Sequence, residues 1–188
     1  MRQAAALLVH AGTVVSAERL IDQLWGEDPP PTATTALQVH ASQLRKVLGD
    51  LLVTVGSGYA LQVQSSQLDV LRFEAAVREA RVELPDRPAQ AARRLTDALA
   101  LWHGEPFGEV PAIPDVVAAR TRLAELRLSA REDRAGAELA LGRHAEVTAE
   151  LAALAAEQPT REGPAELLVL ALYRTGRPAE ALRAYHRL

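Results

Sequence analysis

The stretch ALQVHASQLRKVLG, residues 36–49, carries side chains of the kinds that bind nucleic acids. Glutamine pairs with adenine through two hydrogen bonds, arginine and lysine bind guanine or phosphate, and a valine methyl group contacts the methyl group of thymine. At about 100° per residue, a helix here turns one face outward. The residues of that face are Gln38, Val39, Ser42, Gln43, Arg45 and Lys46. We expect the first four to contact base edges and the last two to hold phosphate, as in a recognition helix.

The opposite side of this helix is an apolar stripe with spacings of four, three and four residues. It consists of Leu37, Ala41, Leu44 and Leu48. Val39 lies off the stripe among polar side chains, and a role in a DNA groove explains this position. Two plainer interpretations stay open. A single exposed valine needs no function, or the helix is rolled so that Val39 is half-buried.

The charge of the first third of the chain predicts weak binding to DNA. Up to residue 64 there are four basic residues and five acidic residues, a net charge of −1. Nucleic-acid-binding proteins usually present a basic surface, because phosphate contacts supply most of their non-specific affinity. Arg45 and Lys46 do lie on the outer helix, whereas Glu27 and Asp28 lie in the loop before it. We therefore expect a single copy to bind DNA weakly.

The segments around this helix predict a winged helix-turn-helix over residues 1–64. A first helix covers 4–9, and Ser16 is a suitable N-cap for a second helix that ends at Trp25. The loop GEDPPPTAT leads into the recognition helix, with Thr32 or Thr34 as its cap. Two short strands then follow, LLVTV and YALQV, joined by a GSG turn.

Residues 65–188 predict an all-helical second domain. Helices are expected near 69–82, 88–102, 115–141, 143–157, 162–175 and 177–188, with proline or glycine at most of the breaks. LGRHAE around Gly142 and TGRPAE around Gly176 are 34 residues apart, and Pro159 lies 17 residues after the first glycine. This period is typical of tetratricopeptide repeats. The fold class is therefore mostly α, a winged helix-turn-helix followed by a tetratricopeptide-like domain.

Other classes of protein are excluded or disfavoured. The chain has no cysteine, which excludes disulfides, thiolate metal sites and cysteine nucleophiles. No phosphate-binding loop, serine nucleophile elbow or HExxH zinc motif is present, so we expect neither an enzyme nor a bound cofactor. No apolar run approaches the roughly 18–20 residues that span a bilayer, and no secretory leader is recognisable. We expect a cytoplasmic protein.

The residues also resemble a known family. VVSAERLIDQLWGEDPPPTATTALQVHASQLRKVLG followed by GYAL resembles the OmpR-like DNA-binding half of the SARP-type antibiotic regulatory proteins. LDVLRFEAAVREAR, ALALWHGEPF and LALYRTGRPAEALRAYHRL resemble the bacterial transcriptional activator domain that follows it. The resemblance implies an activator that binds direct repeats upstream of antibiotic-biosynthesis genes. It also implies a helical domain, residues 65–188, that contacts RNA polymerase and assists assembly. A homodimer is one candidate assembly of the chain.

Three features depart from that family. Its members begin with a small sheet before the first helix, whereas this sequence starts inside that helix. We therefore expect Leu7, Leu8 and Val9 to be covered by the second domain or by a neighbouring subunit. Gln43 and Val55 stand where the family often has arginine. The sequence also ends within the last repeat helix, and we expect a truncated or diverged regulator. The rival hypothesis is a protein-interaction scaffold whose winged helix has lost most of its affinity for DNA.

Overall fold

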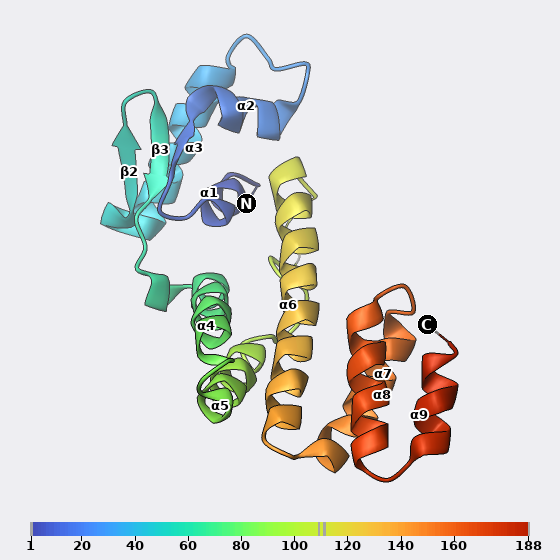
Figure 1. The fold of residues 1–188 in the computed structure, drawn as a ribbon. Helices are drawn as coiled ribbons and strands as arrows, with labels where there is room; N and C mark the ends of the chain where they lie inside the picture. The colour runs from blue at the N-terminus through green and yellow to red at the C-terminus, as the bar shows by residue number, and fades with distance from the viewer. Residues whose placement is uncertain (1, 109, 111, 188) are drawn as a thin grey trace. The chain divides into compact units, whose positions relative to one another are not determined.

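The computed structural model describes residues 2–108, 110 and 112–187 (Figure 1). The chain divides into two compact units. The first comprises Met1–Leu71 with His103–Ala124, and the second comprises Arg72–Trp102 with Glu125–Leu188. Residues 103–124, which follow the predicted junction, thus fold with the winged helix.

The first unit has the element order of a winged helix-turn-helix, as predicted. Its elements are α1 (Arg2–Val9), β1 (Val14–Ser16), α2 (Ala17–Trp25), α3 (Ala33–Leu48), β2 (Leu52–Val55) and β3 (Gly58–Leu61). Short 3-10 turns cover Gly49–Leu51 and Ser65–Gln67. The strands form one antiparallel sheet in the order β1-β3-β2.

Strand β1 was not predicted, and Gly58 explains how it joins the hairpin. Val15 pairs with Tyr59, and Ser16 pairs with Gly58. A Cβ atom at position 58 would lie 2.5 Å from the carbonyl oxygen of Val15. The second glycine of GSG therefore permits the close approach of β1, whereas Gly56, at φ +57°, makes the turn.

Helix α2 begins with an N-cap hydrogen bond from a side chain, whereas α3 begins without one. Ser16 caps α2 as predicted, because its Oγ accepts a hydrogen bond from the backbone N–H of Arg19 at 3.1 Å. Thr32 occupies the N-cap position of α3, but its side chain makes no capping hydrogen bond. Gly49 ends α3 at φ +58°, where an L-residue would be strained.

The core of the first unit includes side chains from beyond residue 102. Leu7 is buried, and Val9 packs against the same core as Ile113 and Val116. These two come from the start of α6 (Pro114–Ala140) and the residue before it, so residues 103–124 supply the expected cover. Leu8 differs, because it stays 36% exposed.

The second unit is all-helical. Its helices are α4 (Asp69–Glu83), α5 (Pro88–Leu99), the later part of α6, α7 (His144–Glu157), α8 (Glu162–Arg174) and α9 (Pro178–Tyr185). α4 and α6 each begin in the first unit. α8 packs against both α7 and α9 (Figure 1). No described helix is long and apolar enough to cross a bilayer.

The 34-residue repeat is visible in two equivalent turns. Gly142 and Gly176 have φ values of +81° and +73°. After each glycine the backbone N–H of an arginine reaches back over the turn. Arg143 donates to the carbonyl of Glu138 at 3.0 Å, and Arg177 donates to that of Leu172 at 2.9 Å. Equivalent residues thus make equivalent bonds, which supports the repeat that the sequence predicted.

Candidate nucleic-acid interface

Helix α3 turns its predicted outer face to solvent. Leu37 and Ala41 are buried, and Leu44 and Leu48 pack partly against the core. Val39 keeps 51% of its surface exposed and lies outside the core. The other residues predicted for the site are exposed as well. They are Gln38, Ser42, Gln43, Arg45 and Lys46.

The helical period adds one residue to this face. Thr35, Val39, Ser42 and Lys46 follow each other at spacings of four, three and four, and all are exposed. Together they form the centre of the solvent-facing side of α3, which we call the outer stripe. Thr35 was not among the predicted site residues, although the same helical period places it one turn before Val39.

Arg45 occupies the flank of α3 that faces the hairpin. Its Nε donates to the carbonyl oxygen of Leu52 at 3.2 Å, and its Nη2 donates to the hydroxyl of Thr54 at 2.8 Å. The guanidinium therefore joins α3 to β2. Lys46 differs, because it forms no ion pair or hydrogen bond with the part of the chain that the structure describes.

The hairpin occupies the position of a wing but carries no basic side chain. Residues 51–63, LLVTVGSGYALQV, contain neither lysine nor arginine. Its tip is held in place, because the backbone N–H of Ala17 donates to the carbonyl of Ser57 at 3.0 Å. The wing can therefore contact a DNA backbone through hydroxyl and amide groups rather than through charge.

Asp115, in the first turn of α6, binds residues of α2 and of the turn that follows α1. Its carboxylate accepts from Arg19 Nη2 at 3.1 Å, and its Oδ2 lies 2.7 Å from His10 Nε2. Its backbone N–H donates to Gln23 Oε1 at 3.2 Å. We call these four residues the Asp115 cluster. Burial raises the pKa of Asp115, but the hydrogen bonds from Arg19 and His10 outweigh it and hold the pKa below its ordinary value.

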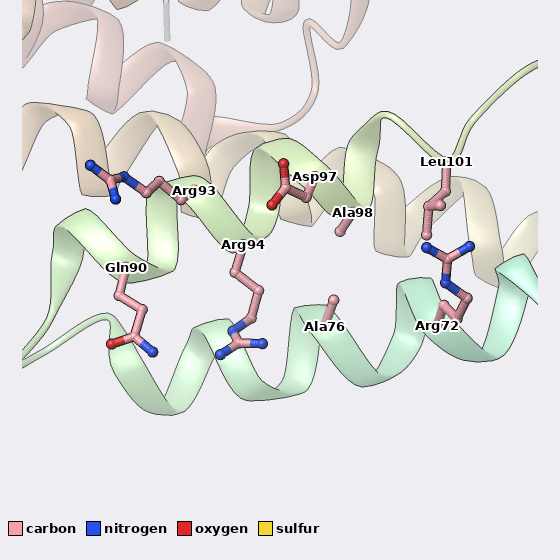
Figure 2. Close-up of a pocket in the computed structure, with 8 residues that line it drawn as sticks. All are labelled: Arg72, Ala76, Gln90, Arg93, Arg94, Asp97, Ala98 and Leu101. Carbon is pink, nitrogen blue, oxygen red and sulfur yellow. The ribbon is translucent and has the colours of Figure 1, made fainter. Parts of the chain in front are cut away.

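The second unit contains a groove of about 350 Å³ between α4 and α5. Arg72, Ala76, Gln90, Arg93, Arg94, Asp97, Ala98 and Leu101 line it (Figure 2). Figure 2 shows Arg94 pointing from α5 toward α4, where it binds Glu79 at 2.6 Å and Glu83 at 2.9 Å. The hydrogen bonds from Arg94 to Glu83 hold the pKa of Glu83 below its ordinary value. Arg94 therefore serves to join two helices.

Comparisons with known proteins identify the family. Residues 68–188 match the bacterial transcriptional activator domain, and residues 2–61 match the C-terminal domain of transcriptional regulatory proteins. The regulatory protein DnrI of Streptomyces peucetius is 37% identical, and the match covers 100% of this chain and 74% of DnrI. The chain belongs to the SARP-type regulatory family.

Longer relatives match this SARP-type chain along nearly its whole length. The regulatory protein AfsR of Streptomyces griseus is 43% identical over 96% of this chain, which spans only 19% of AfsR. A structure of Mycobacterium tuberculosis EmbR in complex with a low-affinity phosphopeptide is also similar, at 33% identity. The similarity has a TM-score of 0.90 and covers 99% of this chain and 52% of EmbR. The SARP-type chain therefore corresponds to only part of these relatives.

Proposed function

We propose that this chain is a sequence-specific DNA-binding transcriptional activator of secondary-metabolite genes. Helix α3 enters the major groove, α2 supports it, and the β2–β3 hairpin lies along the backbone. The observation that carries the proposal is the exposed face of α3. Its centre holds an exposed apolar side chain, Val39, among groups that hydrogen-bond to base edges. Membership of a family of transcriptional regulators supports the same function.

The side chains of α3 divide into three roles. Gln38, Val39, Ser42 and Gln43 contact base edges, and Lys46 binds phosphate. Arg45 was also predicted to bind phosphate. We assign Arg45 a positioning role instead, because its guanidinium already bonds to β2.

The low basic charge determines how the protein assembles on DNA. A single copy neutralises few phosphates, so two copies on direct repeats are needed for stable binding. The helical unit then contacts the partner copy and RNA polymerase. We place this function in the cytoplasm and propose no enzymatic role.

A second candidate function is an interaction scaffold that binds another regulator and has lost its affinity for DNA. Two observations favour it. The resemblance to SARP-type proteins implies arginine at the positions of Gln43 and Val55, and Arg19 and Arg45 are engaged within the unit.

Gel retention of a random-sequence duplex pool across a salt series separates the two functions. The activator retains a specific subset of duplexes at physiological salt, whereas a scaffold retains none even at low salt.

The variant Val39→Ala refines this test. We expect its specific affinity to fall by no more than roughly 1–3 kcal/mol, with an unchanged melting temperature because Val39 lies outside the core. Val47→Ala is the matched control, since Val47 is 83% exposed on the same helix. A melting temperature that falls by several degrees in Val39→Ala, with DNA binding intact, would make Val39 a structural residue.

A further inference from the structure

The outer stripe contains methyl groups but no available guanidinium. Thr35 and Val39 are exposed one helical turn apart, and each carries methyl carbon at its tip. The helix Ala33–Leu48 has one arginine, Arg45, and its guanidinium is bonded to Leu52 and Thr54 of β2. The other charged side chain of α3, Lys46, lies in the last turn.

The side chains of the outer stripe determine which bases α3 can distinguish. Guanine is read chiefly by arginine or lysine, adenine by asparagine or glutamine, and thymine by apolar contact with its methyl group. The N-terminal turns of a recognition helix make most base contacts. In α3 those turns carry Thr35, Gln38, Val39 and Ser42, whereas Lys46 lies far along the helix. The base-contacting part of the helix therefore suits adenine and thymine better than guanine.

We propose that Thr35 is a further specificity-determining residue, and that Thr35 and Val39 each contact a thymine methyl group in an A·T-rich half-site. The proposal rests on the proposed function, namely that α3 enters the major groove. Residues four apart are separated by about 6 Å along a helix, and base pairs by about 3.4 Å. The two thymines therefore lie on adjacent or next-but-one base pairs. Gln38, between the two side chains on the flank of the stripe, binds a neighbouring adenine.

Replacing thymine by deoxyuridine tests this inference, because the change removes one methyl group and leaves the base pairing intact. The probe is a duplex selected by the chain from a random-sequence pool, with each thymine replaced singly by deoxyuridine. We expect two nearby positions at which the replacement weakens binding about fourfold, the effect of one buried methyl group. Elsewhere the replacement leaves affinity unchanged.

Two variants assign each methyl group to its partner. Thr35→Ser removes a methyl group and keeps the hydroxyl, and Val39→Ala shortens the other side chain. Each variant should lose sensitivity to deoxyuridine at one of the two positions and keep it at the other. Val47→Ala should keep both, because Val47 lies about 80° around the helix from Val39. Since all three side chains are exposed, the variants fold normally.

The outcomes separate this inference from the proposed function. If the selected duplexes are rich in guanine at the contacted positions, or if deoxyuridine changes nothing, thymine readout is wrong while DNA binding stands. If wild-type protein retains no duplex even at low salt, the proposed function and this inference both fail.

Discussion

The two units share one use of arginine and differ in another. In the helical unit, arginines bond to carboxylates on neighbouring helices. Arg81 binds Asp133 at 2.7 Å, and Arg161 binds Glu125 at 2.7 Å. In the winged unit, Arg19 likewise binds the carboxylate of Asp115 at 3.1 Å, whereas Arg45 bonds to a carbonyl and a hydroxyl group of β2. Charged side chains in both units thus bond to other elements of the same unit. The outer stripe of α3 is left with a single cation, Lys46.

Burial of apolar side chains stabilises both units. Exposed ion pairs contribute little, with a median of about 0–1 kcal/mol. The helical unit therefore depends on side chains such as Leu151 and Leu154, which are fully buried. The winged unit depends on Ile113 and Val116, which come from beyond residue 102, to complete its core.

The largest effect is expected at Val116. Val116 is 0% exposed, whereas its neighbour Val117 is 47% exposed. Val116→Ala removes two buried methyl groups and should lower the free energy of unfolding by about 2 kcal/mol. Val117→Ala, the matched control, should change it by less than about 0.5 kcal/mol. Urea denaturation measures both.

The tryptophans report on the two units separately. Trp25 lies in the winged unit, and Trp102 packs against Phe73 in the helical unit, with ring centroids 5.4 Å apart. In variants that retain one tryptophan, Val116→Ala should shift the Trp25 transition more than the Trp102 transition. Equal shifts would mean that the two units unfold together in one cooperative transition.

Sequence reasoning succeeded where a local pattern determines structure. Ser16 marked the start of α2, and the repeated glycines located equivalent turns in the helical unit. The buried stripe of α3 followed from helical period alone. These features depend on residues a few positions apart, so the sequence displays them directly.

Sequence reasoning failed where distant segments meet. β1 has only three residues, and its pairing depends on Gly58 more than 40 positions later. Asp115 contacts His10 and Arg19 across about a hundred residues, which no periodicity indicates. The bonds of Arg45 to β2 were hidden for a related reason, because the turn that returns the strand to α3 is not encoded in α3 itself.

A smaller effect is expected for Asp115→Asn, which removes the charge at the centre of the Asp115 cluster. Loss of charge-assisted hydrogen bonds should lower the free energy of unfolding by about 1–2 kcal/mol. Because the folded-state pKa of Asp115 is depressed, this stabilisation is present above the unfolded pKa of about 3.9 and is lost as pH falls through the folded pKa.

Urea denaturation at about pH 7 and at about pH 3 checks the sign. The difference between wild type and Asp115→Asn should be large at the higher pH and should shrink at the lower one. A difference that stays constant over this range would show that the carboxylate charge is not what holds His10 and α2 to α6.

The smallest effect concerns the two cations of α3, and it distinguishes their roles. Lys46 is exposed and has no ion-pair partner within the described chain, so Lys46→Ala should leave the melting temperature unchanged. Because Lys46 is a phosphate contact, Lys46→Ala should weaken binding to all duplexes alike and reduce the slope of log affinity against log salt by about 0.9.

Arg45→Ala should do the reverse. It breaks the bonds to Leu52 and Thr54, so it should lower the melting temperature by a few degrees and leave the salt slope unchanged. If Arg45→Ala reduces the slope as much as Lys46→Ala does, Arg45 releases β2 to bind phosphate, and the difference between the two cations exists only in the free protein.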